Sequence, residues 1–212
     1  MKEGVRKRLR EIAEEHQRGA NGGHRADHTA RVVRDACKLA VGYPQADLTV
    51  LETAAWLHDI GHGRKRHKGV SHAVASAEMT AKLLPEMGYT PAMVAIICQA
   101  IVDHRYSSGR VPESLEGKLL QDADRLDALG AIGIARAFAD STERYLYDMD
   151  DPLAEHRPLD DHRYTLDHFF TKLLTLTETM HTPEARALAA QRVEYMRSFL
   201  REFADEIALP TS

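Results

Sequence analysis

The sequence has few of the features that mark disulfide-rich, membrane or nucleic-acid-binding proteins. Its two cysteines, Cys37 and Cys98, lie far apart in apolar stretches and form no C-x-x-C pair, so we expect reduced, buried thiols. No apolar run approaches the roughly 18 residues of a membrane span, and the charged first residues do not resemble a signal peptide. Lysine and arginine (28) are outnumbered by aspartate and glutamate (32), which leaves no basic field for a nucleic acid polymer. We therefore expect a cytoplasmic protein.

The pattern along the chain is helical, and no run of alternating apolar and polar residues is long enough to predict a strand. Asp47, Thr90 and Thr182 are suited to cap helices, and Pro91 and Pro183 to begin them. The sequence predicts one all-α domain, in which the last two helices pack on a core of five to six. The expected helices span 1–18, 26–42, 48–59, 71–87, 91–104, 115–129, 131–143, 162–180 and 183–207.

The sequence contains twelve histidines among 212 residues, which is an unusually large number. Some histidines and aspartates interrupt helices that are otherwise apolar. His58 and Asp59 end a stretch from Leu48 that is almost wholly apolar, which predicts that both are buried. Burying a lone carboxylate costs several kcal/mol unless it is paired or bound to a metal. His58 and Asp59 could satisfy each other, and this alternative remains open for the pair alone.

Two more polar residues interrupt apolar helices. His28 precedes Val32 and Val33 at helical spacing, and Asp124 lies in the mostly apolar stretch GKLLQDADRLDALGAIG. A satisfied core histidine and a surface salt bridge explain these residues if each is taken alone. Together with His58 and Asp59 they indicate a metal site instead. Imidazole with carboxylate suits Mn, Fe, Zn, Co or Ni far better than Ca.

The order of these residues, with the stretches LHDIGHG and QDADRLDALGAIG, resembles the HD superfamily of metal-dependent phosphohydrolases. The tail DPLAEHRPLDDHRYTLDHFFTKLLTLTETM is similar to a subfamily of small bacterial HD hydrolases, the YedJ/YpgQ-like group. The resemblance implies a single HD domain over 1–212, with a helical core at about 24–130 and a C-terminal helical extension at about 131–208. It also implies a divalent metal ion (Mn, Mg, Fe, Co or Ni, with Zn less favoured).

Carried over by position, the resemblance implies that His28, His58, Asp59 and Asp124 ligate the metal. Asp122 and Asp127 compete with Asp124, and the A-D-R-L wording of the superfamily favours Asp124. In two-metal HD proteins, histidines placed like His72 and His104 hold a second ion. The position of His72 is often not a histidine in the small-hydrolase subfamily, so one ion is the default expectation and a second stays open.

Basic residues near these positions are candidates for binding a substrate phosphate. Lys65, Arg66 and Lys68 lie in the loop that follows the HD pair, where they could clamp phosphate oxygens or simply be solvated. His62 and His67 fall in the same loop and are expected to be solvated with it. In the tail motif, the candidates for substrate binding are Arg157, Arg163, His168 and Lys172.

The expected reaction is the hydrolysis of a phosphate ester or phosphoanhydride of a small molecule, with nucleotides as the leading substrate class. A metal-activated water would attack phosphorus. Asp59 is expected to accept a proton from this water, and His104 or Asp127 to act as general acid or base. Two rival functions remain open: a di-iron HD-type oxygenase and a non-catalytic nucleotide-binding regulator. A homo-oligomer is compatible with the sequence.

Overall fold

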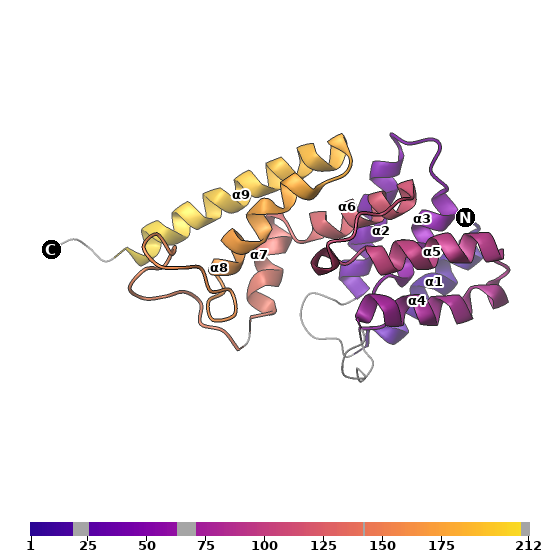
Figure 1. Cartoon of the computed structure of the whole chain (residues 1–212), viewed down its shortest axis with the longest axis horizontal. Helices are drawn as coiled ribbons and strands as arrows, with labels where there is room; N and C mark the ends of the chain where they lie inside the picture. The colour runs from indigo at the N-terminus through magenta and orange to yellow at the C-terminus, as the bar shows by residue number, and fades with distance from the viewer. Residues whose placement is uncertain (19–25, 63–70, 142, 209–212) are drawn as a thin grey trace. The chain divides into compact units, whose positions relative to one another are not determined.

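The computed structural model describes residues 1–18, 26–62, 71–141 and 143–208, and these ranges are helical with connecting turns (Figure 1). Within them, extended backbone pairs only in an isolated bridge between Tyr145 and Tyr164. The all-α class is therefore confirmed. No helix in these ranges is both long and apolar enough to cross a membrane. By its internal contacts the chain divides into two compact units, Met1–Leu126 and Asp127–Ser212.

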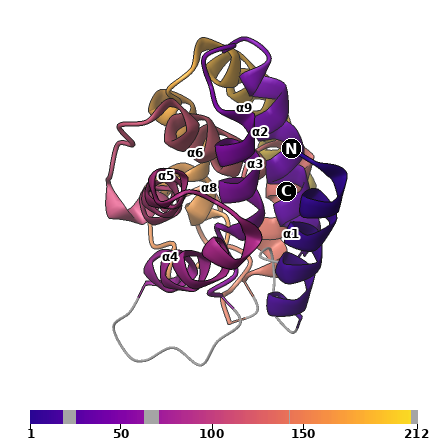
Figure 2. The ribbon, with the colours of Figure 1, turned by 90° about the vertical axis from the view of Figure 1, so that its right-hand side faces the viewer.

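The first unit is built around one helix. The helix α3 contacts α1, α2, α4 and α5, and α4 and α5 run side by side (Figure 2). The helix α6 also belongs to this unit, apart from its last residue. The helices of the first unit are α1 (Glu3–His16), α2 (Ala26–Ala40), α3 (Leu48–Leu57), α4 (His72–Leu83), α5 (Pro91–Asp103) and α6 (Leu115–Asp127).

The central position of α3 follows from its sequence. Every side chain over 50–57 is buried, because this helix is apolar on nearly all sides. As predicted, Asp47 caps it: Oδ1 accepts hydrogen bonds from the backbone N–H of Thr49 and Val50 at 2.8 and 3.1 Å. The one acid inside the helix, Glu52, accepts from the guanidinium of Arg6 on α1. The central helix thus ends deep in the unit, at the HD pair.

The second unit contains α7 (Gly130–Ala139), α8 (Asp167–Thr171), the 3₁₀ helix η3 (Leu173–Thr179) and α9 (Pro183–Ile207). The rings of Phe138 and Phe169 both pack against Phe199 of α9, with centroids 6.0 and 6.2 Å away. The last helix has the bounds that the sequence predicts. Thr182 caps it by accepting from the backbone N–H of Ala185, and Pro183 is its first residue.

The predicted continuous helix over 162–180 is wrong. The segment contains the short α8, which ends at Thr171, and then η3; between them Lys172 has the non-helical angles φ −138° and ψ −58°. The threonine hydroxyls of Thr175 and Thr179 donate to the backbone carbonyls of Lys172 and Leu176, three residues earlier. Such side-chain bonds compete with the α-helical pattern, and a series of β-branched residues weakens it further.

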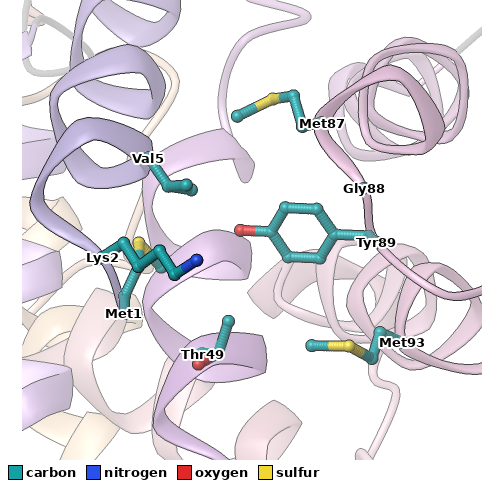
Figure 3. A pocket seen from close by; sticks show the side chains of 8 residues that line it. All are labelled: Met1, Lys2, Val5, Thr49, Met87, Gly88, Tyr89 and Met93. Carbon is teal, nitrogen blue, oxygen red and sulfur yellow. The ribbon is translucent and has the colours of Figure 1, made fainter.

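A cavity of about 410 Å³ opens in the first unit between α1, α3 and the start of α5 (Figure 3). The ring of Tyr89 lies between the thioethers of Met87 and Met93, and its hydroxyl points toward α1 and α3. That hydroxyl lies 2.7 Å from Oγ1 of Thr53. The cavity is at the N-terminal end of α5, whereas His104 follows the C-terminal end of this helix. It is therefore separate from the histidine and aspartate residues singled out above.

Candidate metal centre

The buried end of α3 carries the histidine and aspartate of the HD pair. His58 caps the helix, Asp59 follows in the turn, and their side chains are 0% and 2% exposed. Because a buried carboxylate is costly unless it is paired or binds a metal, the groups around Asp59 decide what this site can do.

Two histidines of the site are oriented by the backbone of their own helices. Nδ1 of His58 lies 2.8 Å from the carbonyl oxygen of Ala55, and Nδ1 of His104 lies 2.6 Å from that of Ile101. A carbonyl oxygen can only accept, so both Nδ1 atoms carry a proton and donate it. The Nε2 atoms of both rings are then directed at Asp59, at 3.6 and 3.5 Å. This second hydrogen bond is the usual way in which proteins orient a metal-ligating histidine.

The protonation of the site is set by burial and by charge. Burial lowers the pKa of His58 to about 4, so its Nε2 offers a lone pair at neutral pH. Burial also acts to lower the pKa of His104, but the hydrogen bond to Asp59 and the charge of Asp59 outweigh it and raise that pKa. Burial disfavours ionised Asp124 too, yet the hydrogen bond and charge of His28 hold the pKa of Asp124 well below its usual range. The carboxylate of Asp124 therefore stays ionised, as binding of a cation requires.

Four side chains from separate parts of the sequence form the first group of ligand atoms. Nε2 of His28 on α2 lies 3.3 Å from Nε2 of His58 and 3.4 Å from Oδ1 of Asp124 on α6. Oδ2 of Asp59 lies 3.7 Å from Nε2 of His28 and 3.6 Å from Nε2 of His58. The Nε2 atom of His58 is also 3.9 Å from Oδ1 of Asp124.

These separations fit a divalent metal ion. Ligand atoms about 2.1 Å from a common ion lie about 3.0 Å apart at 90° and about 3.4 Å apart at the tetrahedral angle. The five separations of 3.3 to 3.9 Å that involve Nε2 of His28 or His58 approach these values. Two imidazoles with two carboxylates are a donor set for Mn, Fe, Co, Ni or Zn. The structure thus brings together His28, His58, Asp59 and Asp124, which were the four predicted ligands.

Among the three aspartates on α6, Asp124 is the one whose carboxylate lies 3.4 Å from Nε2 of His28. Its side chain is 23% exposed, so the group is also accessible to solvent there. Asp122 is fully buried. The carboxylate of Asp127 accepts a hydrogen bond of 2.7 Å from the guanidinium of Arg136, within the second unit. A role for Asp127 as general acid or base stays a prediction.

Three further histidines surround the other oxygen of Asp59. The Nε2 atoms of His62, His72 and His104 lie 3.7, 3.7 and 3.5 Å from Oδ1. His72 is the first residue of α4, and His104 caps the end of α5. Burial lowers the pKa of His72 to about 3, so this ring is neutral at pH 7.

Sequence reasoning assigned His62 to a solvated loop and missed its place at the site. The side chain of His62 is only 13% exposed, and its ring lies 4.0 Å from that of His72 between centroids. The available signal was its spacing from the HD pair. A tight turn brings the residue three positions after Asp59 back beside it, and the backbone N–H of His62 indeed donates to the carbonyl of Asp59 at 3.1 Å.

The structure describes only some of the residues that were predicted to bind a substrate phosphate. Lys65, Arg66 and Lys68 lie outside the described residues. The four candidates of the tail lie in the second unit, and a role for them in binding substrate stays a prediction. Arg157 and Arg163 precede α8, His168 lies in it, and Lys172 follows its last residue.

Two of these tail residues have strong partners within the second unit. The guanidinium of Arg157 donates two hydrogen bonds to the buried carboxylate of Asp167, at 2.6 and 2.8 Å, and stacks 4.5 Å from the ring centroid of Tyr164. Nδ1 of His168 lies 3.1 Å from Oδ2 of Asp161. Arg157 therefore organises the loop before α8.

Comparison with known proteins agrees with this geometry. The model of the HD domain family matches residues 25–129. YpgQ of Bacillus subtilis, an uncharacterised protein, is 33% identical over 190 residues, which are 88% of this chain and 86% of YpgQ. The crystal structure of YpgQ in complex with ADP has a TM-score of 0.75 at 30% identity and covers 98% of this chain and 96% of its own. An HD-superfamily hydrolase from Bacillus thuringiensis has a TM-score of 0.74 at 29% identity, covering 97% and 98%.

The matched range 25–129 includes all seven side chains that surround Asp59 or belong to the first group. The similarity to YpgQ extends well beyond this range, into the tail. With its all-α fold and its clustered histidines and aspartates, the chain belongs to the HD domain family and resembles the YpgQ-like proteins within it.

Proposed function

We propose that this protein is a metal-dependent phosphohydrolase that cleaves a phosphate ester or phosphoanhydride of a nucleotide. One observation carries the proposal: the Nε2 atoms of His28 and His58 each lie within 3.9 Å of a carboxylate oxygen of both Asp59 and Asp124. The family supports hydrolysis, since a structural neighbour is named an HD-superfamily hydrolase. The crystallisation of YpgQ with ADP supports a nucleotide ligand.

When bound by these four residues, a divalent ion supplies Lewis acidity, which lowers the pKa of water toward about 7 and polarises a phosphoryl oxygen. His28 and His58 would contribute nitrogen ligands, and the ring of His58 is oriented by its hydrogen bond to the carbonyl oxygen of Ala55. Asp59 is positioned to accept a proton from the attacking water. His104, hydrogen-bonded to Asp59, is the neighbouring group that can receive or return that proton. Manganese is the first metal to test.

The test is a screen of nucleotides and sugar phosphates with Mn²⁺, Mg²⁺, Co²⁺ and Ni²⁺, in which both phosphate and pyrophosphate are measured. We expect hydrolysis of at least one nucleotide. Asp124→Asn should lower kcat/KM by more than about 100-fold. Replacing a residue that only hydrogen-bonds to a metal ligand already lowers metal affinity or activity by about 10–100-fold, and Asp124 is expected to be a ligand itself. Asp205→Asn, an exposed change on α9, is the matched control and should keep full activity. Nucleotide binding without any turnover by the metal-loaded protein would contradict the proposal and favour a regulator.

A second candidate function is a di-iron oxygenase. It is favoured by one observation, that the two oxygens of Asp59 face two separate sets of imidazoles. Aerobic protein purified with its native metal would then contain two irons per chain and show the absorption of a redox-active centre. Protein that hydrolyses nucleotides with Mn²⁺ and contains no iron would exclude this candidate.

A further inference from the structure

We propose that the cavity between α1, α3 and the start of α5 is a binding site for an unbranched medium-chain carboxylate such as octanoate. Its volume of about 410 Å³ falls within the range of about 300–1,000 Å³ that is usual for small-molecule sites. The cavity lies in the first unit, at the opposite end of α5 from His104. The proposal therefore does not rest on the proposed function.

Flexible apolar side chains form most of the cavity wall. Met87 and Met93 lie on either side of the Tyr89 ring, and Met1 and Val5 line the opposite side (Figure 3). All five side chains are half-buried, so each keeps apolar surface that a ligand can cover. Methionine is unbranched and polarisable, which lets it adapt to irregular apolar groups. An acyl chain can therefore pack along this wall without a rigid fit.

A single cation gives the cavity a charged end. Among the described residues that line it, Lys2 is the only one with a charged side chain. Its ammonium and the hydroxyl of Tyr89 point toward each other (Figure 3). The neighbouring acids have partners of their own, since Glu3 pairs with Arg6 at 3.0 Å and Asp47 caps α3. Lys2 therefore favours a ligand that carries a negative charge.

Helix ends around the cavity favour an anion as well. The helices α1, α3 and α5 all begin beside it, because Lys2 is the N-cap of α1, Thr49 lies in the first turn of α3, and Met93 lies in that of α5. The N-terminal end of a helix carries a partial positive charge. Asp47 and Thr90 cap α3 and α5, whereas α1 has no capping side chain. A carboxylate at Lys2 would supply the missing negative charge at the start of α1.

The hydrogen bonds of Tyr89 set the direction of the ligand. Oγ1 of Thr53 donates to the carbonyl oxygen of Thr49 at 2.7 Å, so the hydroxyl of Tyr89 is the donor in its own 2.7 Å bond to Oγ1 of Thr53. The Tyr89 oxygen can then only accept from the cavity, which suits the ammonium of Lys2 and disfavours a carboxylate. The carboxylate is therefore expected at Lys2, and the acyl chain along the methionines.

The test is NMR of the whole protein with carbon-13-labelled methionine methyl groups, titrated with octanoate. We expect the signals of Met87 and Met93 to shift and to saturate at one octanoate per chain. Met180 and Met196, which are buried in the second unit, should not shift. In calorimetry the affinity should rise about fourfold for each CH₂ added between butyrate and octanoate. Octylammonium should bind at least about tenfold more weakly than octanoate.

Two variants test the two ends of the site. Val5→Phe fills the cavity and should abolish the methionine shifts, whereas Lys2→Gln should weaken octanoate binding about tenfold and remove the preference over octylammonium. The matched control is Lys7→Gln, an exposed lysine of α1 that does not line the cavity, and it should bind as the wild type does. Circular dichroism establishes that each variant folds.

Three results would overturn the proposal. The first is that Met87 and Met93 do not shift at millimolar octanoate, and the second is that octanoate and octylammonium bind equally well. The third is an unsaturated shift of the same size at Met149, which is 89% exposed in the second unit, because this would show non-specific association with the amphiphile. None of these measurements depends on metal or turnover, so each result leaves the proposed function untouched.

Discussion

Gly61 offers the sharpest test of the packing that assembles the site. A Cβ atom added there would lie 2.7 Å from both the carbonyl oxygen of His72 and the backbone nitrogen of Ser76, and 3.0 Å from Cβ of Ala75. These are mainly backbone atoms of α4, which cannot rotate away as a side chain can. Gly61→Ala therefore has to separate the HD turn from α4.

The expected cost follows from two contributions. Overpacking of this kind costs about 1–3 kcal/mol. Separation also weakens the buried hydrogen bond from Gly61 to Ser76, 2.9 Å long, which adds about 1 kcal/mol. We expect Gly61→Ala to lower the free energy of unfolding of the first unit by about 2–4 kcal/mol.

Urea denaturation followed by tryptophan fluorescence measures this effect, because the single tryptophan, Trp56, is buried in α3 of the first unit. The matched control is Gly4→Ala. Gly4 is exposed on α1 with no atom within 4 Å of its added Cβ, so alanine should be neutral or stabilise by up to about 1 kcal/mol. Equal urea midpoints for Gly61→Ala and the wild type would refute the close contact between turn and α4.

Three further predictions concern the metal, a buried ion pair and pH. Removing metal with a chelator should lower the melting temperature, and Asp124→Asn should abolish this sensitivity; an unchanged melting temperature in wild type would argue against a bound ion. Arg157→Met should destabilise the second unit by about 3–5 kcal/mol, because the buried carboxylate of Asp167 loses both hydrogen bonds from the guanidinium, and adding Asp167→Asn should recover part of the loss in calorimetry. Folding lowers the pKa of His58 from 6.5 to about 4, so between these pH values the unfolded chain binds a proton that the folded protein does not. Metal-free protein should therefore lose stability as the pH falls from 6.5 to 4. In His58→Gln the urea midpoint should depend less on pH over this range.

The sequence predicted best the helices that begin with a capping residue or a proline. α9 begins at Pro183 after the Thr182 cap, and α3 begins after Asp47, as expected. The segment 162–180 failed because apolar spacing suggested a helix, while the threonine hydroxyls of its second half bond to the backbone instead. Such competition depends on local geometry that hydrophobic periodicity does not report.

At the candidate site, too, local sequence signals predicted some residues and missed another. His28, His58, Asp59 and Asp124 could be singled out because a polar residue in an apolar helix is conspicuous in the sequence. His62 was missed, because it lies among glycines and basic residues, a composition typical of a solvated loop. Its burial depends on the approach of α4 to the HD turn, which is a long-range contact that no local pattern encodes.

The central claim is that four side chains form one metal site, and anomalous diffraction from crystals grown with Mn²⁺ tests it most directly. We predict a manganese peak about 2.0–2.3 Å from Nε2 of His28 and His58 and from a carboxylate oxygen of Asp59 and Asp124. Crystals of Asp124→Asn should show that peak weakened or lost. A peak elsewhere in the protein, with these four ligand atoms more than about 3 Å from any ion, would contradict the account.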